Sequence, residues 1–247
     1  MHSLDISEFE AVIFDLDSTL TDTHRYPIIA TEWLLVKSGV TSEQEIASYV
    51  RHLVTRYREA IQAIVEGAPF RSPFDIIRTA MEQSLEDFNL NTDQKIVDEA
   101  TQRFKSLHIE LSTVYSGVTE LLDSLLGKGK ALGVISNSFI GHANIILKKL
   151  ELDHYFSSVI DCGDVQGFKP MSSLFLRVAR DLDVEASKSI YVGDEYYADM
   201  VGAKGVGMTT IWINKWERSL SDLVDKHGAE TTPDFVLDSV SEMNKML

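Results

Sequence analysis

The stretch AVIFDLDSTLTD, residues 11–22, begins with four apolar residues and then places two acids, Asp15 and Asp17, one residue apart. A short apolar run of this kind is typical of a strand that is buried on both faces of a sheet. The two carboxylates therefore lie at the carboxyl end of a predicted strand, which is where open α/β sheets bind their ligands. We expect a functional site at this point of the fold.

A long helical segment interrupts the sheet that this strand begins. From residue 22 to residue 111 the apolar residues recur at spacings of three and four. Ser42 and Glu45 form a capping-box pattern, and Gly39 and Gly67 are placed to end helices. The predicted helices are residues 26–39, 42–67, 72–90 and 92–111.

From about residue 113 short β-rich runs alternate with helical segments, which is the pattern of a parallel sheet built from βαβ units. The predicted strands are 131–137, 157–164, 189–194, 209–214 and 234–239, and the predicted helices are 117–128, 141–151, 171–182 and 197–204. We therefore predict an α/β core domain, residues 1–21 and 112–247, with an inserted all-helical domain, residues 22–111. An insert after the end of a strand is a candidate lid or substrate-selecting domain.

Composition limits the function classes. The 247 residues include 38 acids and 23 Lys and Arg residues, a net charge of -15, and no basic block, which argues against a surface that binds nucleic acid. No apolar run approaches the roughly 18 residues of a membrane helix, and the N-terminal MHSLDISEFE lacks the features of a secretory signal. Cys162 is the single cysteine, so an internal disulfide is excluded. We predict a cytoplasmic protein with no nucleic-acid or membrane partner.

Polar side chains cluster at the ends of several predicted strands. Because the strands are parallel, these ends meet at one edge of the sheet. The residues are Asp15, Asp17, Ser136, Asn137 and Asp194, with Lys169 and Asp199 a few residues beyond strand ends. Carboxylates that share one point repel each other unless a cation lies between them, and their hard oxygen atoms favour Mg²⁺.

The same set of residues suits phosphoryl transfer. Lys169 and the Ser136 hydroxyl supply a positive charge and a hydrogen-bond donor for phosphoryl oxygens. The reaction needs an in-line nucleophile, neutralised charge and a proton donor for the leaving oxygen. One carboxylate of the pair can attack, and Asp17 can act as acid and then as base. Two acids are placed at the strand end because attack and proton transfer are separate tasks.

Four motifs taken together resemble those of the haloacid dehalogenase superfamily of hydrolases. They are DLDSTL, the ISN strand end, the Lys-Pro pair and GDEYYAD, in this order between residues 12 and 199. The resemblance implies a Rossmann-like core and identifies the helical insert as the cap of the phosphatase and dehalogenase members.

The resemblance also implies a role for each matching residue. Asp15 would attack phosphorus to form an aspartyl phosphate, and Asp17 would protonate the leaving alcohol and later activate water. Asp15, Asp194 and the main-chain carbonyl of Asp17 would hold Mg²⁺. The remaining implied roles are a phosphoryl grip by Ser136 and the backbone N–H of Asn137, charge compensation by Lys169, and metal support or an outer contact by Asp199.

Two positions bear on the reaction type. Ser18 follows Asp17 where many relatives have Gly. Dehalogenating relatives lack an acid at the position of Asp17, because a halide leaving group needs no proton, so Asp17 favours phosphate esters. A 2-haloacid dehalogenase and a phospho-accepting module without turnover are the alternatives.

The predicted function is hydrolysis of a small phosphorylated metabolite, with phosphoglycolate-like compounds, sugar phosphates and nucleotides all open. The predicted assembly is a monomer or a homodimer. Outside the site, Trp33, Trp212 and Trp216 are predicted core or interface residues, since each lies in an apolar segment. Cys162 is predicted to be a buried and inert thiol.

Overall fold

The computed structural model describes residues 4–247, so the first three residues of the N-terminal stretch and of the predicted core domain lie outside the described part. The described chain divides into two compact units, one ending at Asp22 and resuming at Thr113, the other running from Thr23 to Ser112. Each boundary lies one residue from the predicted position. Among residues 4–247, no helix has the length and apolar character that crossing a membrane requires.

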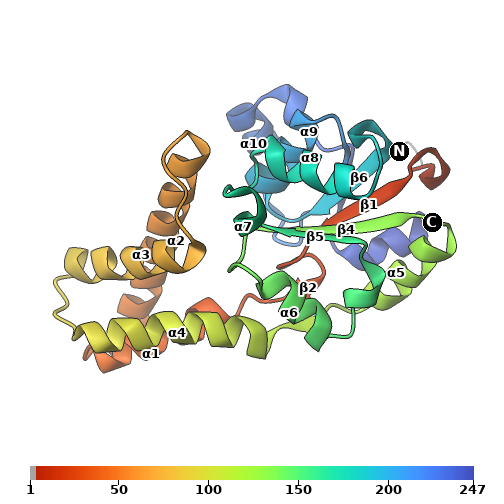
Figure 1. The fold of residues 1–247 in the computed structure, drawn as a ribbon. Helices are drawn as coiled ribbons and strands as arrows, with labels where there is room; N and C mark the ends of the chain where they lie inside the picture. The colour runs from red at the N-terminus through yellow and green to blue at the C-terminus, as the bar shows by residue number, and fades with distance from the viewer. Residues whose placement is uncertain (1–3) are drawn as a thin grey trace. The chain divides into compact units, whose positions relative to one another are not determined.

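A sheet of six parallel strands forms the centre of the first unit (Figure 1). The strand order is β5-β4-β1-β6-β7-β8. The strands are β1 (Ala11–Asp15), β4 (Ala131–Ser136), β5 (Ser158–Asp161), β6 (Ser189–Gly193), β7 (Thr209–Ile213) and β8 (Phe235–Leu237). The prediction of an α/β core with a parallel sheet is confirmed.

Strand β1 occupies the middle of this sheet because it is apolar on both faces. All five of its residues are buried. It pairs with β4 on one side and β6 on the other, with Val12 opposite Leu132 and Ile190. The chain order changes direction at β1, and such a switch point is where open α/β sheets form their ligand crevices.

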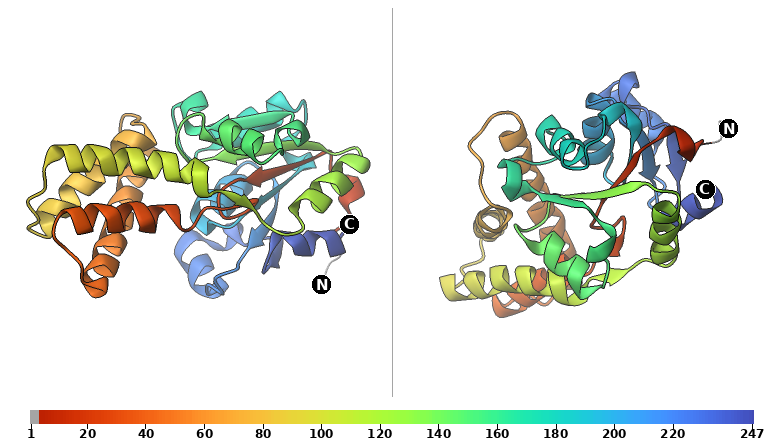
Figure 2. Two further views of the ribbon diagram at one scale, coloured as in Figure 1. Left: turned by 90° about the horizontal axis from the view of Figure 1, so that it is seen from below. Right: turned by 45° about the vertical axis from the view of Figure 1, so that its right-hand side comes forward.

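Helices cover both faces of the sheet (Figures 1 and 2). On one face Ile13, Tyr191 and Trp212 pack with residues of α8, including Phe175 and Val178. This face also carries α9, while α5 and α6 lie on the opposite face. The helices of this unit are α5 (Val118–Gly127), α6 (His142–Lys149), α7 (Cys162–Val165), α8 (Ser172–Asp181), α9 (Gly202–Gly205) and α10 (Leu220–His227), with a π-helix, η4 (Tyr196–Val201), before α9.

Short 3₁₀ turns and a small two-stranded sheet complete this unit. The turns are η1 (Ile6–Glu8), η2 (Asp153–Tyr155), η3 (Ala186–Lys188), η5 (Ala229–Thr231) and η6 (Val240–Lys245). Strand β2 (Thr21–Asp22) pairs antiparallel with β3 (Thr113–Val114). The two ends of the helical insert therefore leave the first unit side by side.

The second unit consists of four helices, as predicted. They are α1 (Tyr26–Lys37), α2 (Glu43–Val65), α3 (Pro73–Asp87) and α4 (Gln94–Leu111), and α1 packs on α4 while α2 packs on α3. Ser42 caps α2 by accepting a hydrogen bond from the N–H of Glu45 at 3.5 Å. The buried Tyr49 hydroxyl donates to the Met81 carbonyl at 3.0 Å and links α2 to α3.

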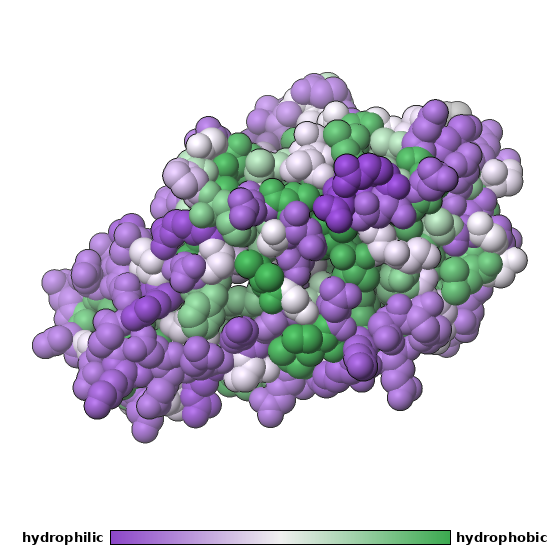
Figure 3. Space-filling model, in the orientation of Figure 1, coloured by the Kyte–Doolittle hydropathy of each residue, from purple (hydrophilic) through white to green (hydrophobic). Residues whose placement is uncertain are grey.

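The structure corrects one strand boundary and one tryptophan. The strand predicted for 157–164 ends at Asp161, because Asp161 and Asp164 form a capping box that starts α7. Trp212 is fully buried as predicted, but the Trp216 side chain is 61% exposed. Trp216 is therefore not a core residue, and its alternative assignment to an interface stays a prediction. On the face of the molecule drawn in Figure 3, hydrophilic residues predominate and hydrophobic residues occupy smaller areas between them.

Candidate active site

The carboxyl ends of three adjacent strands bring the predicted site residues to one edge of the sheet. Asp15 is the last residue of β1, Ser136 is the last residue of β4, and Asp194 directly follows β6. Because β4 and β6 flank β1, residues more than a hundred positions apart in the sequence become neighbours. The prediction that these strand ends share an edge is confirmed.

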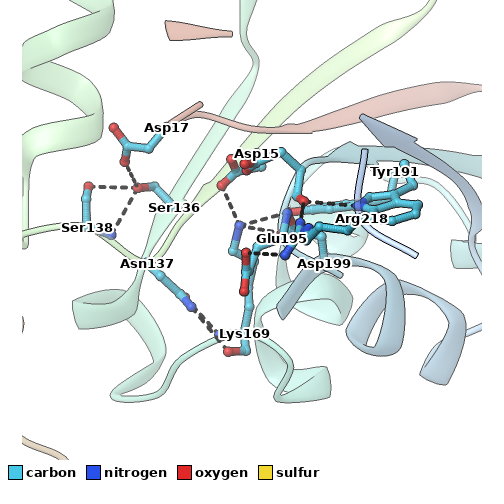
Figure 4. A network of polar contacts seen from close by, with 12 residues as sticks. Asp15, Asp17, Ser136, Asn137, Ser138, Lys169, Tyr191, Glu195, Asp199 and Arg218 are labelled. Atoms are coloured by element: carbon cyan, nitrogen blue, oxygen red, sulfur yellow. Dashed lines mark hydrogen bonds and ion pairs between the residues drawn. The ribbon is translucent and has the colours of Figure 1, made fainter. Parts of the chain in front are cut away.

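Lys169 lies at the centre of this edge and is buried. Its Nζ donates to Asp15 Oδ1 at 2.5 Å, to Asp199 Oδ1 at 2.7 Å and to the Tyr191 hydroxyl at 3.2 Å (Figure 4). The Asn137 side chain holds the Lys169 backbone: its Oδ1 accepts from the Lys169 N–H at 2.8 Å and its Nδ2 donates to the Lys169 carbonyl at 3.2 Å. Both polar atoms of the Asn137 side chain are thus bonded to the Lys169 backbone. Only the backbone N–H of Asn137 is then left for the implied phosphoryl contact.

Three carboxylates meet beside this lysine. One oxygen from each of Asp15, Asp194 and Asp199 lies within 4.8 Å of the other two. Burial raises the pKa of Asp15 well above its usual range, and Lys169 offsets this only in part, while the neighbouring acids add to it. Burial alone would lower the pKa of Lys169, but Asp15 and Asp199 raise it well above its usual range, so the ammonium stays charged. The single positive charge of Lys169 does not balance three carboxylates, and carboxylate oxygens are hard ligands. The group therefore fits a divalent cation.

Asp199 differs from the other two acids because hydrogen bonds occupy both of its oxygens. Oδ1 accepts from Lys169 and from the Tyr191 hydroxyl at 3.0 Å, and Oδ2 accepts from the Glu195 N–H at 2.9 Å. Gly193 makes room for this carboxylate, since a Cβ at that position would lie 2.4 Å from Asp199 Cγ. Asp199 therefore orients Lys169 and the loop that carries Asp194.

Asp17 is not one of the three clustered carboxylates and is only half-buried. Its Oδ2 accepts a hydrogen bond from the Ser136 hydroxyl at 3.3 Å, and that hydroxyl also pairs with Ser138 Oγ at 2.7 Å. The tight turn after Asp17 sets this position: the Leu16 carbonyl accepts from the N–H groups of Leu20 and Thr21, each at 3.0 Å. An accessible carboxylate beside the serine is well placed for proton transfer.

Ser18 has a φ of 67°, in the left-handed region that favours glycine. A glycine would adopt this backbone conformation without steric cost, and here a small polar residue adopts it. Its N–H donates to the Thr21 carbonyl at 2.7 Å, which closes the turn. The serine is therefore compatible with the predicted geometry of Asp17.

Several residues of the site were not predicted from the sequence. Tyr191 contacts both Lys169 and Asp199, and Ser138 contacts Ser136. Arg218 donates to the main-chain carbonyl of Asp194. It also donates to Glu195 Oε2 at 3.1 Å (Figure 4). Tyr191 could have been found from strand alternation, because it lies two residues before Gly193 and so points to the same face.

Cys162 lies near this site without the features of a nucleophile. Its side chain is fully buried, and its Sγ donates to the Ser138 carbonyl at 3.4 Å. Burial raises the pKa of the thiol to about 12, so the thiolate form is scarce at neutral pH. The prediction of a buried and inert thiol agrees with this environment.

We predict that Asp194→Asn stabilises the protein in the absence of metal at pH 8. Burial, followed by Asp199, raises the pKa of Asp194 to about 7 from an ordinary value of 3.8. Stability from this group is therefore present below pH 3.8 and is lost as the pH rises through 7. In EDTA we expect the melting temperature of Asp194→Asn to exceed that of the wild type by about 5 °C at pH 8, with a smaller gain at pH 5 and none below pH 3.8.

Calorimetry at the two pH values measures this difference. Asp181→Asn is the matched control, because Asp181 pairs with Arg177 on the exposed face of α8. An Asp194→Asn protein that melts below the wild type at pH 8 in EDTA contradicts the proposed cost of holding a buried charge beside Asp199.

Comparisons with known proteins agree with the geometry of a hydrolase site. Residues 12–213 match the family model of haloacid dehalogenase-like hydrolases. The chain belongs to this family, which confirms the predicted family and the predicted hydrolase.

Curated relatives match over nearly the whole chain. It is 25% identical to a glyceraldehyde 3-phosphate phosphatase of Methanothermobacter thermautotrophicus, over 96% of this chain and 99% of the relative. It is also 25% identical to the pyrophosphatase PpaX of Bacillus cereus, over 97% of each chain. A crystal structure of a dehalogenase with an intermediate complex has the same fold, with a TM-score of 0.76, 19% identity and 97% of both chains covered.

Proposed function

We propose that the protein is a Mg²⁺-dependent phosphatase that hydrolyses a small phosphomonoester through an aspartyl phosphate. The observation that carries the proposal is the joint placement of Asp15, Asp194 and Lys169 at one buried point, with a second accessible acid, Asp17, beside Ser136. The names of the curated relatives, a glyceraldehyde 3-phosphate phosphatase and a pyrophosphatase, support a small phosphorylated substrate.

In the proposed first step a carboxylate oxygen of Asp15 attacks phosphorus. The bond from phosphorus to the ester oxygen breaks, and Asp17 gives its proton to the leaving alcohol. Lys169 keeps its proton and compensates negative charge on Asp15 and on the phosphoryl group. Ser136 and the backbone N–H of Asn137 hold phosphoryl oxygens.

In the second step Asp17, now ionised, removes a proton from a water molecule that attacks the phosphorus of the aspartyl phosphate. The bond from phosphorus to the Asp15 oxygen breaks, inorganic phosphate leaves, and both carboxylates return to their initial states. Asp15, Asp194 and the main-chain carbonyl of Asp17 would hold Mg²⁺, which supplies further positive charge for the phosphoryl oxygens. Asp199 supports this arrangement through Lys169 and Glu195.

The second candidate function is 2-haloacid dehalogenation, which the structural neighbour keeps open. That reaction needs the nucleophile but no proton donor for the leaving halide. The hydrogen bond between Ser136 and Asp17 favours the phosphatase, because it keeps an acid beside the position of the reacting group. The lid role of the insert, the cytoplasmic location and the monomeric or homodimeric state remain predictions.

The proposal predicts that the purified protein hydrolyses p-nitrophenyl phosphate with Mg²⁺ and that excess EDTA reduces turnover by at least about 100-fold. Restoration of turnover by added Mg²⁺ controls for irreversible damage. Full turnover in EDTA contradicts the metal assignment. Glyceraldehyde 3-phosphate, pyrophosphate, phosphoglycolate and a 2-chlorinated acid, assayed side by side, test the substrate class, and release of chloride without release of phosphate would favour the second candidate.

A further inference from the structure

The loop that follows β7, residues 214–218, contacts both of the turns that carry site carboxylates. The Lys215 ammonium donates to the Ser18 carbonyl at 2.9 Å, directly after Asp17. The Arg218 guanidinium donates to the main-chain carbonyl of Asp194. We call residues 214–218 the β7 loop. Through these two hydrogen bonds the β7 loop links the turn after Asp17 to the turn that carries Asp194.

Hydrogen bonds within the β7 loop hold its two cations at a fixed separation. The Asn214 side chain accepts from the Arg218 N–H at 2.9 Å and donates to the Arg218 carbonyl at 2.9 Å. The Asn214 N–H donates to the Leu237 carbonyl at 2.7 Å, which anchors the loop to the end of β8. The loop is therefore a closed turn on the rigid sheet.

Aromatic rings hold both cations in place. The Lys215 ammonium lies 5.0 Å from the centre of the Tyr115 ring and 5.3 Å from that of the exposed Trp216, and it also donates to the Tyr115 hydroxyl at 3.0 Å. The Arg218 guanidinium lies 5.5 Å from the centre of the Trp212 ring. Cations at such distances are attracted to the ring faces. This arrangement differs from that of a lysine whose ammonium is surrounded by solvent.

The contact with Ser18 bears on Asp17. The turn after Asp17 is closed by its own N–H groups, which donate to the carbonyls of Leu16 and Thr21. Lys215 reaches the carbonyl of Ser18 from a different part of the chain, so it fixes the direction in which the turn leaves β1. A shift of this turn moves the Asp17 carboxylate relative to Ser136.

We propose that Lys215 is a positioning residue that fixes the turn after Asp17 relative to the loop that carries Asp194. Arg218 supports the Asp194 loop. This inference rests on the proposed function. Lys215 acts through the Ser18 carbonyl, and it is not required to touch substrate. Misplacement of a catalytic group by about 1 Å lowers a rate by about 100-fold, whereas binding of the phosphoryl group depends on other residues.

The test compares the wild type with Lys215→Met, Lys215→Arg and the control Lys128→Met, whose lysine is exposed at the end of α5. With p-nitrophenyl phosphate and Mg²⁺ we expect Lys215→Met to lower kcat by about 10- to 100-fold and to change KM by less than about 3-fold. Lys215→Arg keeps a cation between the two rings and is expected to recover most of the lost kcat.

Hydrogen exchange supplies a readout that does not depend on turnover. In Lys215→Met we expect the amides of Ser18, Leu20 and Thr21 to exchange about 10-fold faster, while those of β1 stay at the wild-type rate. Wild-type kcat together with wild-type exchange in Lys215→Met overturns the inference. The inference is also overturned if Lys215→Met changes only KM, or if its amides exchange faster throughout the sheet.

Failure of the inference is distinguishable from failure of the proposed function. If the wild type hydrolyses no ester, the proposed function is wrong, and exchange at Ser18, Leu20 and Thr21 alone decides whether Lys215 holds the turn. If the wild type is active and Lys215→Met is equally active, with unchanged exchange, the proposed function stands and the inference is wrong.

Discussion

Asp15→Asn is expected to lower turnover of p-nitrophenyl phosphate by at least about 10⁴-fold, because it removes the proposed nucleophile. Asn keeps an oxygen that can accept from Lys169, so the buried hydrogen bond at 2.5 Å in the wild type can persist. The loss would then report chemistry and not collapse of the site. Steady-state turnover and a melting curve in Mg²⁺ measure the two properties separately.

Asp17→Asn is the matched variant, because it removes the other carboxylate of the pair. General acid-base catalysis contributes about 10²- to 10⁴-fold. p-Nitrophenolate is a good leaving group that needs little protonation, so the first step should proceed and hydrolysis of the aspartyl phosphate should become slow. Mass spectrometry of the quenched variant should then find one phosphoryl group on the peptide that contains Asp15.

Two results would contradict this division of tasks. Turnover by Asp15→Asn at the wild-type rate excludes Asp15 as the nucleophile. Wild-type turnover by Asp17→Asn, without accumulation of phosphorylated protein, excludes Asp17 as the acid and base. The argument from Asp17 against a dehalogenase would then be lost.

Lys169→Met is expected to destabilise the metal-free protein by about 3–5 kcal/mol at pH 8. Lys169 is 3% exposed and is paired with both Asp15 and Asp199, so its removal leaves two buried carboxylates without a cation. At pH 5 the loss should be smaller, because burial raises the pKa of Asp15 and the carboxyl takes up a proton in place of the missing ammonium. Urea unfolding in EDTA at the two pH values measures the difference.

Lys204→Met is the control for this prediction. Lys204 pairs with Asp234 at 2.7 Å, but the two side chains are 21% and 36% exposed, and exposed pairs contribute about 0–1 kcal/mol. Equal losses of unfolding free energy in the two variants would contradict the claim that burial sets the strength of the Lys169 network. A loss at pH 5 as large as that at pH 8 would contradict the proposed proton uptake.

Much of the fold could be predicted because the sequence pattern and the tertiary environment agree. Strand β1 is apolar throughout and is buried on both faces, so its pattern alone indicates a central strand. Helix α2 carries a Ser42 cap where the sequence predicts one. Acids after β1 and β6 were predicted to meet because parallel strands place their carboxyl ends at one edge, and the positions of Asp15 and Asp194 agree.

Other features depend on contacts that a linear pattern does not contain. Strands β2 and β3 have two residues each, which is too short for a recognisable alternation. Helix α10 begins at Leu220, with Ser219 as its cap, and its short amphipathic segment was not recognised. Lys215 and Arg218 resemble ordinary surface cations in the sequence, because the carbonyl groups of Ser18 and Asp194 that they contact are brought beside them by the fold.

The position of β1 between β4 and β6 has a consequence for how the chain folds during synthesis. β1 is made first, but its two neighbours are separated from it by the 23–112 segment and by most of the first unit. At about 5–20 residues per second, the ribosome delivers β6 roughly 10 to 35 s after β1. The helical segment has local contacts and can fold before β4 is made. The apolar β1 has both edges unpaired until β4 is made, and one edge unpaired until β6 is made. We expect this interval to be when the nascent chain is most prone to aggregate and most dependent on chaperones.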